Sequence, residues 1–292
     1  MVQIHHRFAT VEGRRLFYRE AGPKQAPVIV LLHGFPTSSH MYRDLVPRLA
    51  ERHRVIAPDM LGFGRSDAPG VENFTYTFDS LAHLTGALLD QLGIHRFAMY
   101  VQDYGAPIGW RLVLAAPHAV SAVITQNGNG YEAGFFDSFW TRRAQAYGQN
   151  PTAATEAAVR EAFTLPDIRW QYLTGAPDES LVSPDTWHHD HALLTRPGND
   201  QIQLSLLRDY GNNIPLYPAL HNYLRDSRVP LLAVWGAGDQ IFGPAGARAF
   251  ADDAHDPEIH LLEGGHFLLE TAGEQVADLV LEFVQRRVPT TD

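Results

Sequence analysis

Short apolar runs separated by amphipathic stretches dominate the first half of the chain. Runs that are apolar throughout are typical of strands buried on both faces of a sheet. The predicted strands cover residues 4–9, 15–19, 28–32, 54–57, 97–101 and 120–125. Leucines recur at helical spacing over residues 80–91, which end before Gly93, and residues 106–115 form a second predicted helix.

The last quarter of the chain repeats this alternation, and the middle does not. Strands are predicted over residues 231–235 and 259–262, and helices over residues 245–251 and 274–286. Residues 128–225 lack such apolar runs, and proline repeatedly breaks their helical stretches. The pattern predicts an α/β fold with a mostly parallel central sheet, helices on both faces and a helical lid insertion. Residues 1–127 and 226–292 form the predicted core, and residues 128–225 form a cap above the carboxyl ends of the strands.

Composition and charge narrow the class of protein. The chain has 292 residues, of which 45% are hydrophobic and 19% charged, and its formal net charge is −10. These values exclude a disordered or coiled-coil chain, and the negative charge argues against a nucleic-acid binder. Cysteine is absent, which excludes disulfides, a thiolate nucleophile and Cys-based zinc sites. Neither a signal peptide nor a membrane-spanning apolar stretch is visible, so we expect a cytoplasmic protein.

A candidate nucleophile follows the predicted strand at residues 97–101. The turn that follows places Asp103 where a nucleophile elbow carries its reactive side chain, and Gly105 lets the next helix pass close behind. The N–H groups at the start of that helix favour a carboxylate anion. The loop after residues 28–32 is predicted to offer the backbone N–H of Phe35 to an oxyanion, together with that of Tyr104.

Two later strands end in the partners that such a nucleophile needs. Asp239 follows residues 231–235, and His266 follows residues 259–262. An Asp after a strand is often only a helix N-cap. Here, however, four strand ends carry suitable residues in the order nucleophile, acid, base, which is the chain order of the α/β-hydrolase fold. We therefore predict a catalytic triad of Asp103, Asp239 and His266.

Other histidines in the sequence are predicted to have structural and not catalytic roles. His33 is predicted to hydrogen-bond within its loop and not to react. Asp190 lies among the three histidines His188, His189 and His191, and such a group can ligate a metal. Because no helix or strand register aims these rings, we predict a solvated loop there. Neither a metal nor an organic cofactor is expected.

The whole chain resembles the α/β-hydrolase superfamily and, within it, the branch with an aspartate nucleophile. The segments that carry the resemblance are His33-Gly34-Phe35-Pro36, Val101-Gln102-Asp103-Tyr104-Gly105, Trp235-Gly236-Ala237-Gly238-Asp239 and Gly264-Gly265-His266-Phe267. That branch includes epoxide hydrolases and haloalkane dehalogenases. The resemblance implies that Asp103 attacks a carbon to form an alkyl ester. His266, oriented by Asp239, then activates the water that hydrolyses this ester.

The leaving group separates the two activities. Haloalkane dehalogenases typically hold the halide with a tryptophan directly after the nucleophile, plus an asparagine after the His-Gly pair or a second tryptophan in the lid. This chain has Tyr104 and Phe35 at the first two places, and Trp140 is its candidate in the lid. Epoxide hydrolases typically use two lid tyrosines as proton donors, and the resemblance assigns this role to Tyr210 and Tyr147.

The preferred hypothesis is an epoxide hydrolase that opens an apolar epoxide to a vicinal diol through an ester on Asp103. The alternative is a haloalkane dehalogenase that uses the same covalent step. A third hypothesis, a non-catalytic member of the fold, conflicts with the complete set of Asp103, Asp239 and His266. The expected partners are a small apolar substrate and water, without nucleic acid or a membrane span, and assembly into a homodimer is left open.

Overall fold

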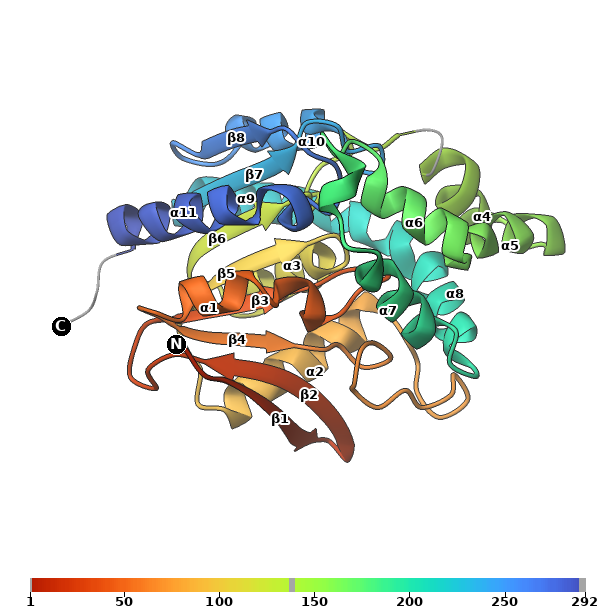
Figure 1. The fold of residues 1–292 in the computed structure, drawn as a ribbon, viewed down its shortest axis with the longest axis horizontal. Coiled ribbons are helices and arrows are strands. Elements are labelled where there is room, and N and C mark those ends of the chain that lie inside the picture. Colours follow the sequence, from red (N-terminus) through yellow and green to blue (C-terminus); the bar gives the residue numbers. More distant parts are fainter. Residues whose placement is uncertain (1, 137–139, 289–292) are drawn as a thin grey trace.

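One sheet forms the centre of the computed structural model, which describes residues 2–136 and 140–288 (Figure 1). Its strands are β1 (Ile4–Val11), β2 (Arg14–Ala21), β3 (Val28–Leu32), β4 (Arg54–Pro58), β5 (Phe97–Gln102), β6 (Val120–Gln126), β7 (Leu231–Gly236) and β8 (Glu258–Leu262). They lie in the order β1-β2-β4-β3-β5-β6-β7-β8. Strand β2 runs antiparallel to β1 and β4, and the pairs from β4 through β8 are parallel. These pairings confirm the predicted mostly parallel sheet, and each strand overlaps the residues at which the sequence predicted it.

Helices cover both faces of the sheet. Helices α2 (Phe78–Gln91) and α3 (Gly105–Ala115) pack on one face, and α1 (Leu45–Leu49) and α11 (Leu269–Arg287) pack on the other. Strand β3 shows the reason, because Val30 and Leu32 join the first core and Ile29 and Leu31 join the second. The chain also forms α10 (Pro244–Ala249) and the 3-10 turns η1 (Ser39–Tyr42) and η6 (Phe250–Asp252).

Helix α11 begins earlier than the sequence predicts. Its backbone is kinked at Ala272, where φ is −127°. The part after the kink begins close to the predicted start at Glu274, and the short part before it carries no helical pattern of its own. Helix α1 was not predicted, because its five residues span little more than one turn and include Pro47.

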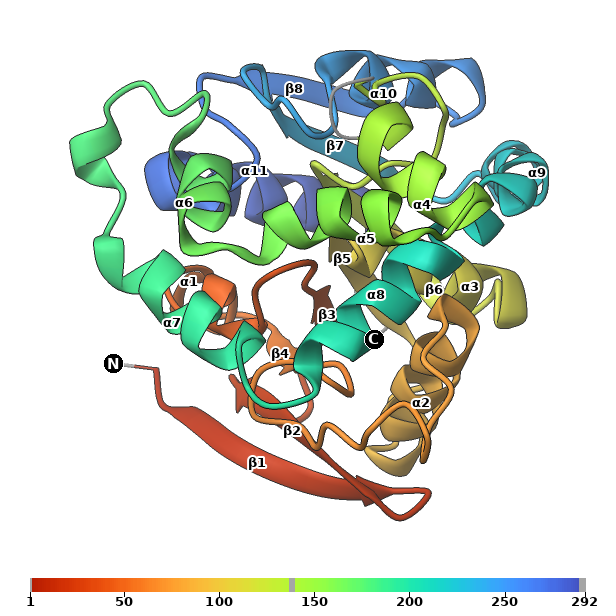
Figure 2. The same cartoon turned by 90° about the vertical axis from the view of Figure 1, so that its right-hand side faces the viewer.

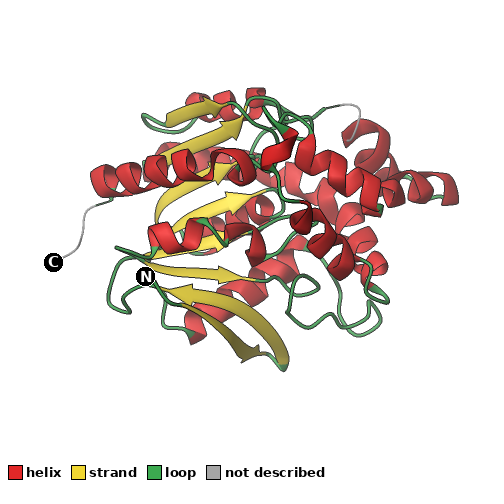
Figure 3. Cartoon of the chain, viewed as in Figure 1, coloured by secondary structure: helices red, strands yellow, loops and turns green. Residues whose placement is uncertain are grey.

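The described residues between β6 and β7 are mostly helical. They contain the π-helical turn η2 (Trp140–Gln145), α4 (Ala146–Gln149), α5 (Ala153–Arg160), η3 (Glu161–Phe163), α6 (Leu165–Leu173), η4 (Glu179–Leu181), α7 (Pro184–Leu194), α8 (Asn199–Asp209), η5 (Tyr210–Leu216) and α9 (Tyr217–Ser227). Helices α4 to α8 gather at one end of the sheet, the end to which β3 and β5 point (Figures 1 and 2). Figure 3 shows the contrast between this helical end and the strands. We call residues 128–225 the lid.

The prediction of a solvated loop around His188, His189 and His191 was wrong, because these residues lie on α7. Pro184 occupies the first turn of that helix, and the Ser183 side chain caps it by accepting a hydrogen bond from a backbone N–H. These local signals were present in the sequence. Within residues 2–136 and 140–288, no group of three or more His, Asp or Glu side chains is arranged to hold a metal ion.

None of the helices in the described part of the chain combines the length and the apolar character needed to cross a membrane.

Candidate active site

A strained turn presents Asp103 at the carboxyl end of β5. Its φ is +46°, in the left-handed region that non-glycine residues rarely adopt. Two glycines leave the space for this turn. A Cβ on Gly105 would lie 2.0 Å from the Leu32 carbonyl oxygen, and a Cβ on Gly34 would lie 2.3 Å from the Asp103 Cβ. The elbow predicted from the sequence therefore forms. Its geometry requires glycine at position 105 in the turn and at position 34 in the neighbouring loop.

Backbone N–H groups hold the Asp103 carboxylate. The Phe35 N–H donates a hydrogen bond to Oδ1 at 2.6 Å, and the Tyr104 N–H donates to the same carboxylate. Burial raises the pKa of Asp103, and the charge of His266 and these two N–H groups act in the opposite direction without cancelling the rise. Both predicted oxyanion donors thus lie at Asp103.

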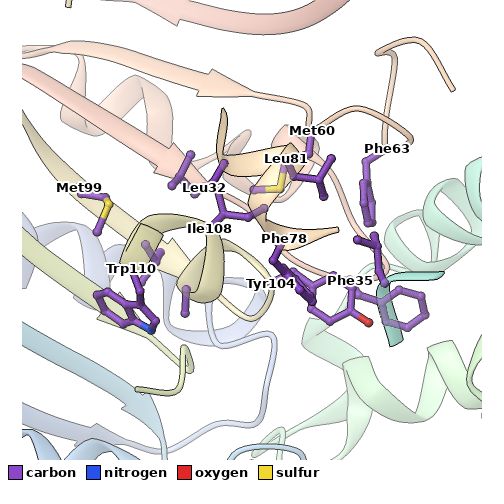
Figure 4. Close-up of a cluster of buried hydrophobic side chains, with 14 of the residues drawn as sticks. Leu32, Phe35, Met60, Phe63, Phe78, Leu81, Met99, Tyr104, Ile108 and Trp110 are labelled. Carbon is purple, nitrogen blue, oxygen red and sulfur yellow. The ribbon is translucent and has the colours of Figure 1, made fainter. Parts of the chain in front are cut away.

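The aromatic rings of these donors are packed in the core. Figure 4 shows Phe35 and Tyr104 among buried apolar side chains that include Phe63 and Phe78. The Tyr104 ring centroid lies 5.9 Å from that of Phe35 and 5.1 Å from that of Phe78. Tight packing of the rings restrains the backbone between them, and so it orients the two N–H donors.

Asp239 and His266 lie in the loops that follow β7 and β8. His266 Nδ1 donates a hydrogen bond to Asp239 Oδ2 at 2.9 Å, and His266 Nε2 lies 3.7 Å from Asp103 Oδ2. The other carboxylate oxygen, Asp239 Oδ1, accepts hydrogen bonds from the backbone N–H groups of Ile241 and Phe242. Nδ1 directs its proton at Asp239, and Nε2 lies on the side of the ring that faces Asp103.

The charge balance around His266 favours its protonated form. Burial by itself lowers the pKa of His266, but the charge and hydrogen bond of Asp239 and the charge of Asp103 outweigh burial and raise it above the usual value. The ring is 2% exposed, so these interactions act in a medium with little water.

Asn127 is a residue of this site that the sequence analysis missed. Its Nδ2 donates a hydrogen bond to Asp239 Oδ2 at 2.7 Å, and its backbone oxygen accepts one from the Asp103 N–H at 3.4 Å. Asn127 therefore links the predicted acid Asp239 to the predicted nucleophile Asp103. The sequence carried a signal for Asn127, because this residue directly follows β6 and the functional residues of such a sheet lie at strand ends.

Gln102 is a second missed residue. Its Nε2 lies 2.9 Å from His266 Nε2, and its side chain is fully buried. While the imidazole is neutral, the Gln102 amide donates to the lone pair on Nε2, an assignment that follows from the hydrogen-bond network, and this bond must break before Nε2 takes up a proton. Such a bond holds the imidazole ring beside Asp103. The position directly before the nucleophile was the available signal.

A small closed cavity lies between Asp103 and the lid. It is lined by Phe35, Asp103, Tyr104, Trp140, Ala144, Gln171, Leu207, Tyr210, Ile241 and Phe242. Its volume is about 20 Å³, which is room for about one water molecule. The walls are mainly aromatic and aliphatic, with few polar groups. A substrate that binds here must be small, or the lid must shift to admit it.

The structure places the two predicted lid tyrosines differently. Tyr210 lines the cavity, and its ring centroid lies 5.8 Å from that of Tyr104 and 4.7 Å from that of Trp140. Burial raises the pKa of Tyr210 well above its ordinary value, so its hydroxyl keeps its proton. Tyr147 lies on α4 outside the cavity lining, where the charged groups acting on it are Glu156, Arg208 and Arg160.

His33 is held within its loop. The backbone N–H of Met60 donates to His33 Nε2 at 3.1 Å, which leaves the proton on Nδ1, and Nδ1 donates to the Gly34 carbonyl oxygen at 3.0 Å. Both ring nitrogens are thus used for structural bonds that join the loops after β3 and β4.

A protein-family model described as the alpha/beta hydrolase fold matches residues 27–272 of this chain. The chain belongs to the α/β-hydrolase fold family. This confirms the superfamily that the strand-end motifs resemble.

Three similar proteins illustrate the range of the family. An uncharacterized hydrolase from Saccharomyces cerevisiae is 42% identical over 278 residues, covering 94% of this chain and 95% of the yeast protein. A haloalkane dehalogenase from Psychrobacter cryohalolentis is 28% identical over 287 residues, covering 92% of this chain and 87% of that protein. The structure of the epoxide hydrolase CorEH shares the fold, with a TM-score of 0.78 at 22% identity over 97% of this chain and 99% of its own. The chain is thus similar in sequence to a haloalkane dehalogenase, and it shares its fold with an epoxide hydrolase.

Proposed function

We propose that this protein is an epoxide hydrolase, which opens an apolar epoxide to a vicinal diol. The observation that carries the proposal is that Tyr210, a buried lid residue with a hydroxyl proton to give, lines the same cavity as Asp103. An epoxide leaves as an alkoxide, which is a poor leaving group until it is protonated, and a tyrosine hydroxyl can supply that proton. Tyr147 is left out of the mechanism, because it lies outside the cavity.

In the first step, Asp103 Oδ2 attacks a ring carbon of the epoxide. The bond between that carbon and the ring oxygen breaks, and the oxygen takes the proton of the Tyr210 hydroxyl. Asp103 Oδ1 is already hydrogen-bonded by the Phe35 N–H, so Oδ1 becomes the carbonyl oxygen of the ester and Oδ2 becomes its alkyl oxygen.

In the second step, His266 Nε2 removes a proton from water as the water oxygen attacks Cγ of Asp103. Negative charge collects on Oδ1, where the Phe35 and Tyr104 N–H groups stabilise it. The tetrahedral species then expels the diol oxygen, which takes the proton from His266. Asp103 is left as a carboxylic acid, and its proton restores the Tyr210 hydroxyl, so the overall reaction is epoxide plus water to diol.

A haloalkane dehalogenase is the second candidate, and two observations favour it. A named haloalkane dehalogenase is 28% identical over 92% of this chain. In addition, Trp140 lines the cavity and offers an indole N–H that is suited to a halide. Against it, the residue after Asp103 is tyrosine and not tryptophan.

Turnover of epoxides and bromoalkanes by the same preparation tests the proposal, together with Tyr210→Phe. We expect epoxide turnover in the wild type and a loss of about 10²-fold or more in the variant, because the phenylalanine cannot protonate the alkoxide. Tyr223→Phe is the control, since Tyr223 is a buried lid tyrosine outside the cavity lining. Full epoxide turnover by Tyr210→Phe would remove Tyr210 as the proton donor and leave the reaction class standing, whereas ready bromide release without epoxide turnover would overturn the proposal.

A further inference from the structure

We propose that Gln171 is a catalytic residue whose side-chain amide donates a hydrogen bond to the ring oxygen of the epoxide and keeps it as that oxygen becomes an alkoxide. The inference rests on the proposed function and assigns the second oxygen-binding group of the same site. It starts from one unsatisfied donor in the cavity.

Gln171 lies on α6, is 3% exposed and lines the cavity together with Asp103 and Tyr210. Its Nε2 is fully buried and has no hydrogen-bond partner among the described residues. A buried N–H donor without a partner destabilises a protein, and donors of this kind are found where a ligand supplies the acceptor. The group that Gln171 is suited to bind is therefore an acceptor oxygen inside the cavity.

The carboxyl end of α6 is held directly against the catalytic loops. A Cβ on Gly175 would lie 2.6 Å from the Gly238 carbonyl oxygen and 2.9 Å from Gly265 Cα, and those two glycines precede Asp239 and His266. This close backbone contact sets the position of α6 relative to the acid and the base.

Stacking fixes the orientation of the same helix. The ring of Tyr172 stacks on that of Phe267 with centroids 3.9 Å apart, and Phe267 directly follows His266. Because Tyr172 is the neighbour of Gln171, this contact restrains the turn of α6 that presents the amide. Gln171 is thus positioned by the same loops that position the triad, which suits a group that must meet a reacting atom.

The chemistry of the epoxide oxygen calls for two donors. The oxygen carries two lone pairs, and after ring opening it bears the developing negative charge. Tyr210 satisfies one lone pair and gives its proton. Gln171 cannot give up a proton, but its N–H can stabilise the charge from the other side. Tyr147 cannot do this from α4, so the amide takes the place that a second tyrosine would otherwise fill.

The test separates ester formation from ester hydrolysis. Single-turnover experiments with an epoxide measure the rate of ester formation on Asp103 and the rate of its decay, for the wild type and for Gln171→Met, which keeps the length of the side chain but removes the donor. We expect ester formation to slow about 10²-fold, as when an oxyanion donor is lost. Ester decay should stay within about twofold, because His266 and the Phe35 and Tyr104 N–H groups carry that step, and the oxygen bound by Gln171 is already a hydroxyl in the ester.

Gln203→Met is the matched control. Gln203 is also a buried lid glutamine with one unpaired atom, but it lies outside the cavity lining and its Nε2 bonds to Asn199. It should leave both rates unchanged. Should Gln171→Met fold poorly in thermal unfolding, Gln171→Leu provides the second variant. Its side chain also has no donor, and it should slow ester formation to a similar extent.

The outcomes separate this inference from the proposed function. If the wild type forms no ester with any epoxide, both are overturned. If the wild type forms the ester and the folded Gln171 variants form it at the wild-type rate, only the role of Gln171 is overturned. Equal slowing of formation and decay would show a structural role and would also overturn it.

Discussion

The pKa of His266 differs between the two proposed steps. In the free enzyme, Asp239 and Asp103 together outweigh burial and raise the pKa of His266. Once Asp103 is esterified it carries no charge, so one of the two groups that favour the imidazolium is lost. The pKa of His266 then falls at the stage where a neutral imidazole must accept a proton from water. In the proposed mechanism, esterification of Asp103 thus adjusts the basicity of His266.

Asp103→Asn imitates this uncharged stage. Removing the carboxylate charge disfavours the imidazolium, so the pKa of His266 should be lower in the variant than in the wild type. NMR titration of the imidazole resonances measures it. Asp44→Asn, which removes the charge of an exposed carboxylate at the protein surface, serves as the control. An unchanged or higher pKa in Asp103→Asn would show that Asp103 does not act on His266 in solution.

His266→Gln should trap the ester on Asp103. Glutamine cannot accept a proton from water, so formation of the ester proceeds while its hydrolysis stops. Intact-protein mass spectrometry after incubation with an epoxide should show an added mass equal to that of the substrate. The double variant with Asp103→Asn should show none. Added mass in the double variant would place the covalent bond on another residue.

Helix α6 is the element that joins the lid to the catalytic loops. Gly175 follows it with φ +83°, and the close approach to Gly238 leaves no space for a side chain. One end of the lid therefore packs against the loops that carry Asp239 and His266. A change in this contact would displace Gln171 and the wall of the cavity together.

Gly175→Ala should weaken the contact between the end of α6 and the loop that carries Asp239. The added Cβ meets the Gly238 carbonyl oxygen and the backbone is strained, so we expect the free energy of unfolding to fall by about 1–3 kcal/mol and turnover to fall with it. Gly198→Ala is the matched control, because Gly198 has φ +81° in the lid with nothing within 4 Å of the added Cβ. Chemical denaturation compares the two. Equal destabilisation would attribute the effect to the backbone conformation alone.

At the scale of the whole molecule, a buried carboxyl group lies where the lid meets the core. Asp190 of α7 accepts a hydrogen bond from the Tyr172 hydroxyl of α6 and is close to Thr37, Arg43 and Glu270 of the core. Burial raises the pKa of Asp190 to about 7, and hydrogen bonds from Tyr172 and Thr37 act in the opposite direction. The folded protein therefore holds a proton here that the unfolded chain releases near its ordinary pKa of 3.8.

This proton makes stability depend on pH. Between about pH 4 and pH 7 the folded state binds more protons at Asp190 than the unfolded state, so its contribution to stability falls as pH rises through that range. Asp190→Asn should remove this loss. We expect a higher urea midpoint than wild type at pH 8 and no difference at pH 4. Glu179→Gln, on the exposed turn η4, should show no such pH-dependent difference. A variant that is less stable than wild type at pH 8 would contradict the prediction.

The sequence by itself determined the core of this protein and the set of residues that meet at its catalytic edge. Apolar runs are local, so each of the strands and the helices α2 and α3 could be placed from its own residues. The carboxyl ends of parallel strands share one edge of the sheet, and this is why residues 103, 239 and 266, each just after a strand, could be expected to lie together. Asn127 follows the same rule and was readable in the same way.

Only the tertiary structure decided the composition of the lid side of the cavity. The lid helices are short, and their apolar residues do not show which face meets the core. Tyr210 and Gln171 line the cavity and Tyr147 does not. Contacts between residues far apart in sequence set the placement of α6 and so of Gln171. The approach of Gly175 to Gly238 is one of these contacts. No local pattern encodes such a contact, since its free energy depends on two segments being brought together by the rest of the fold.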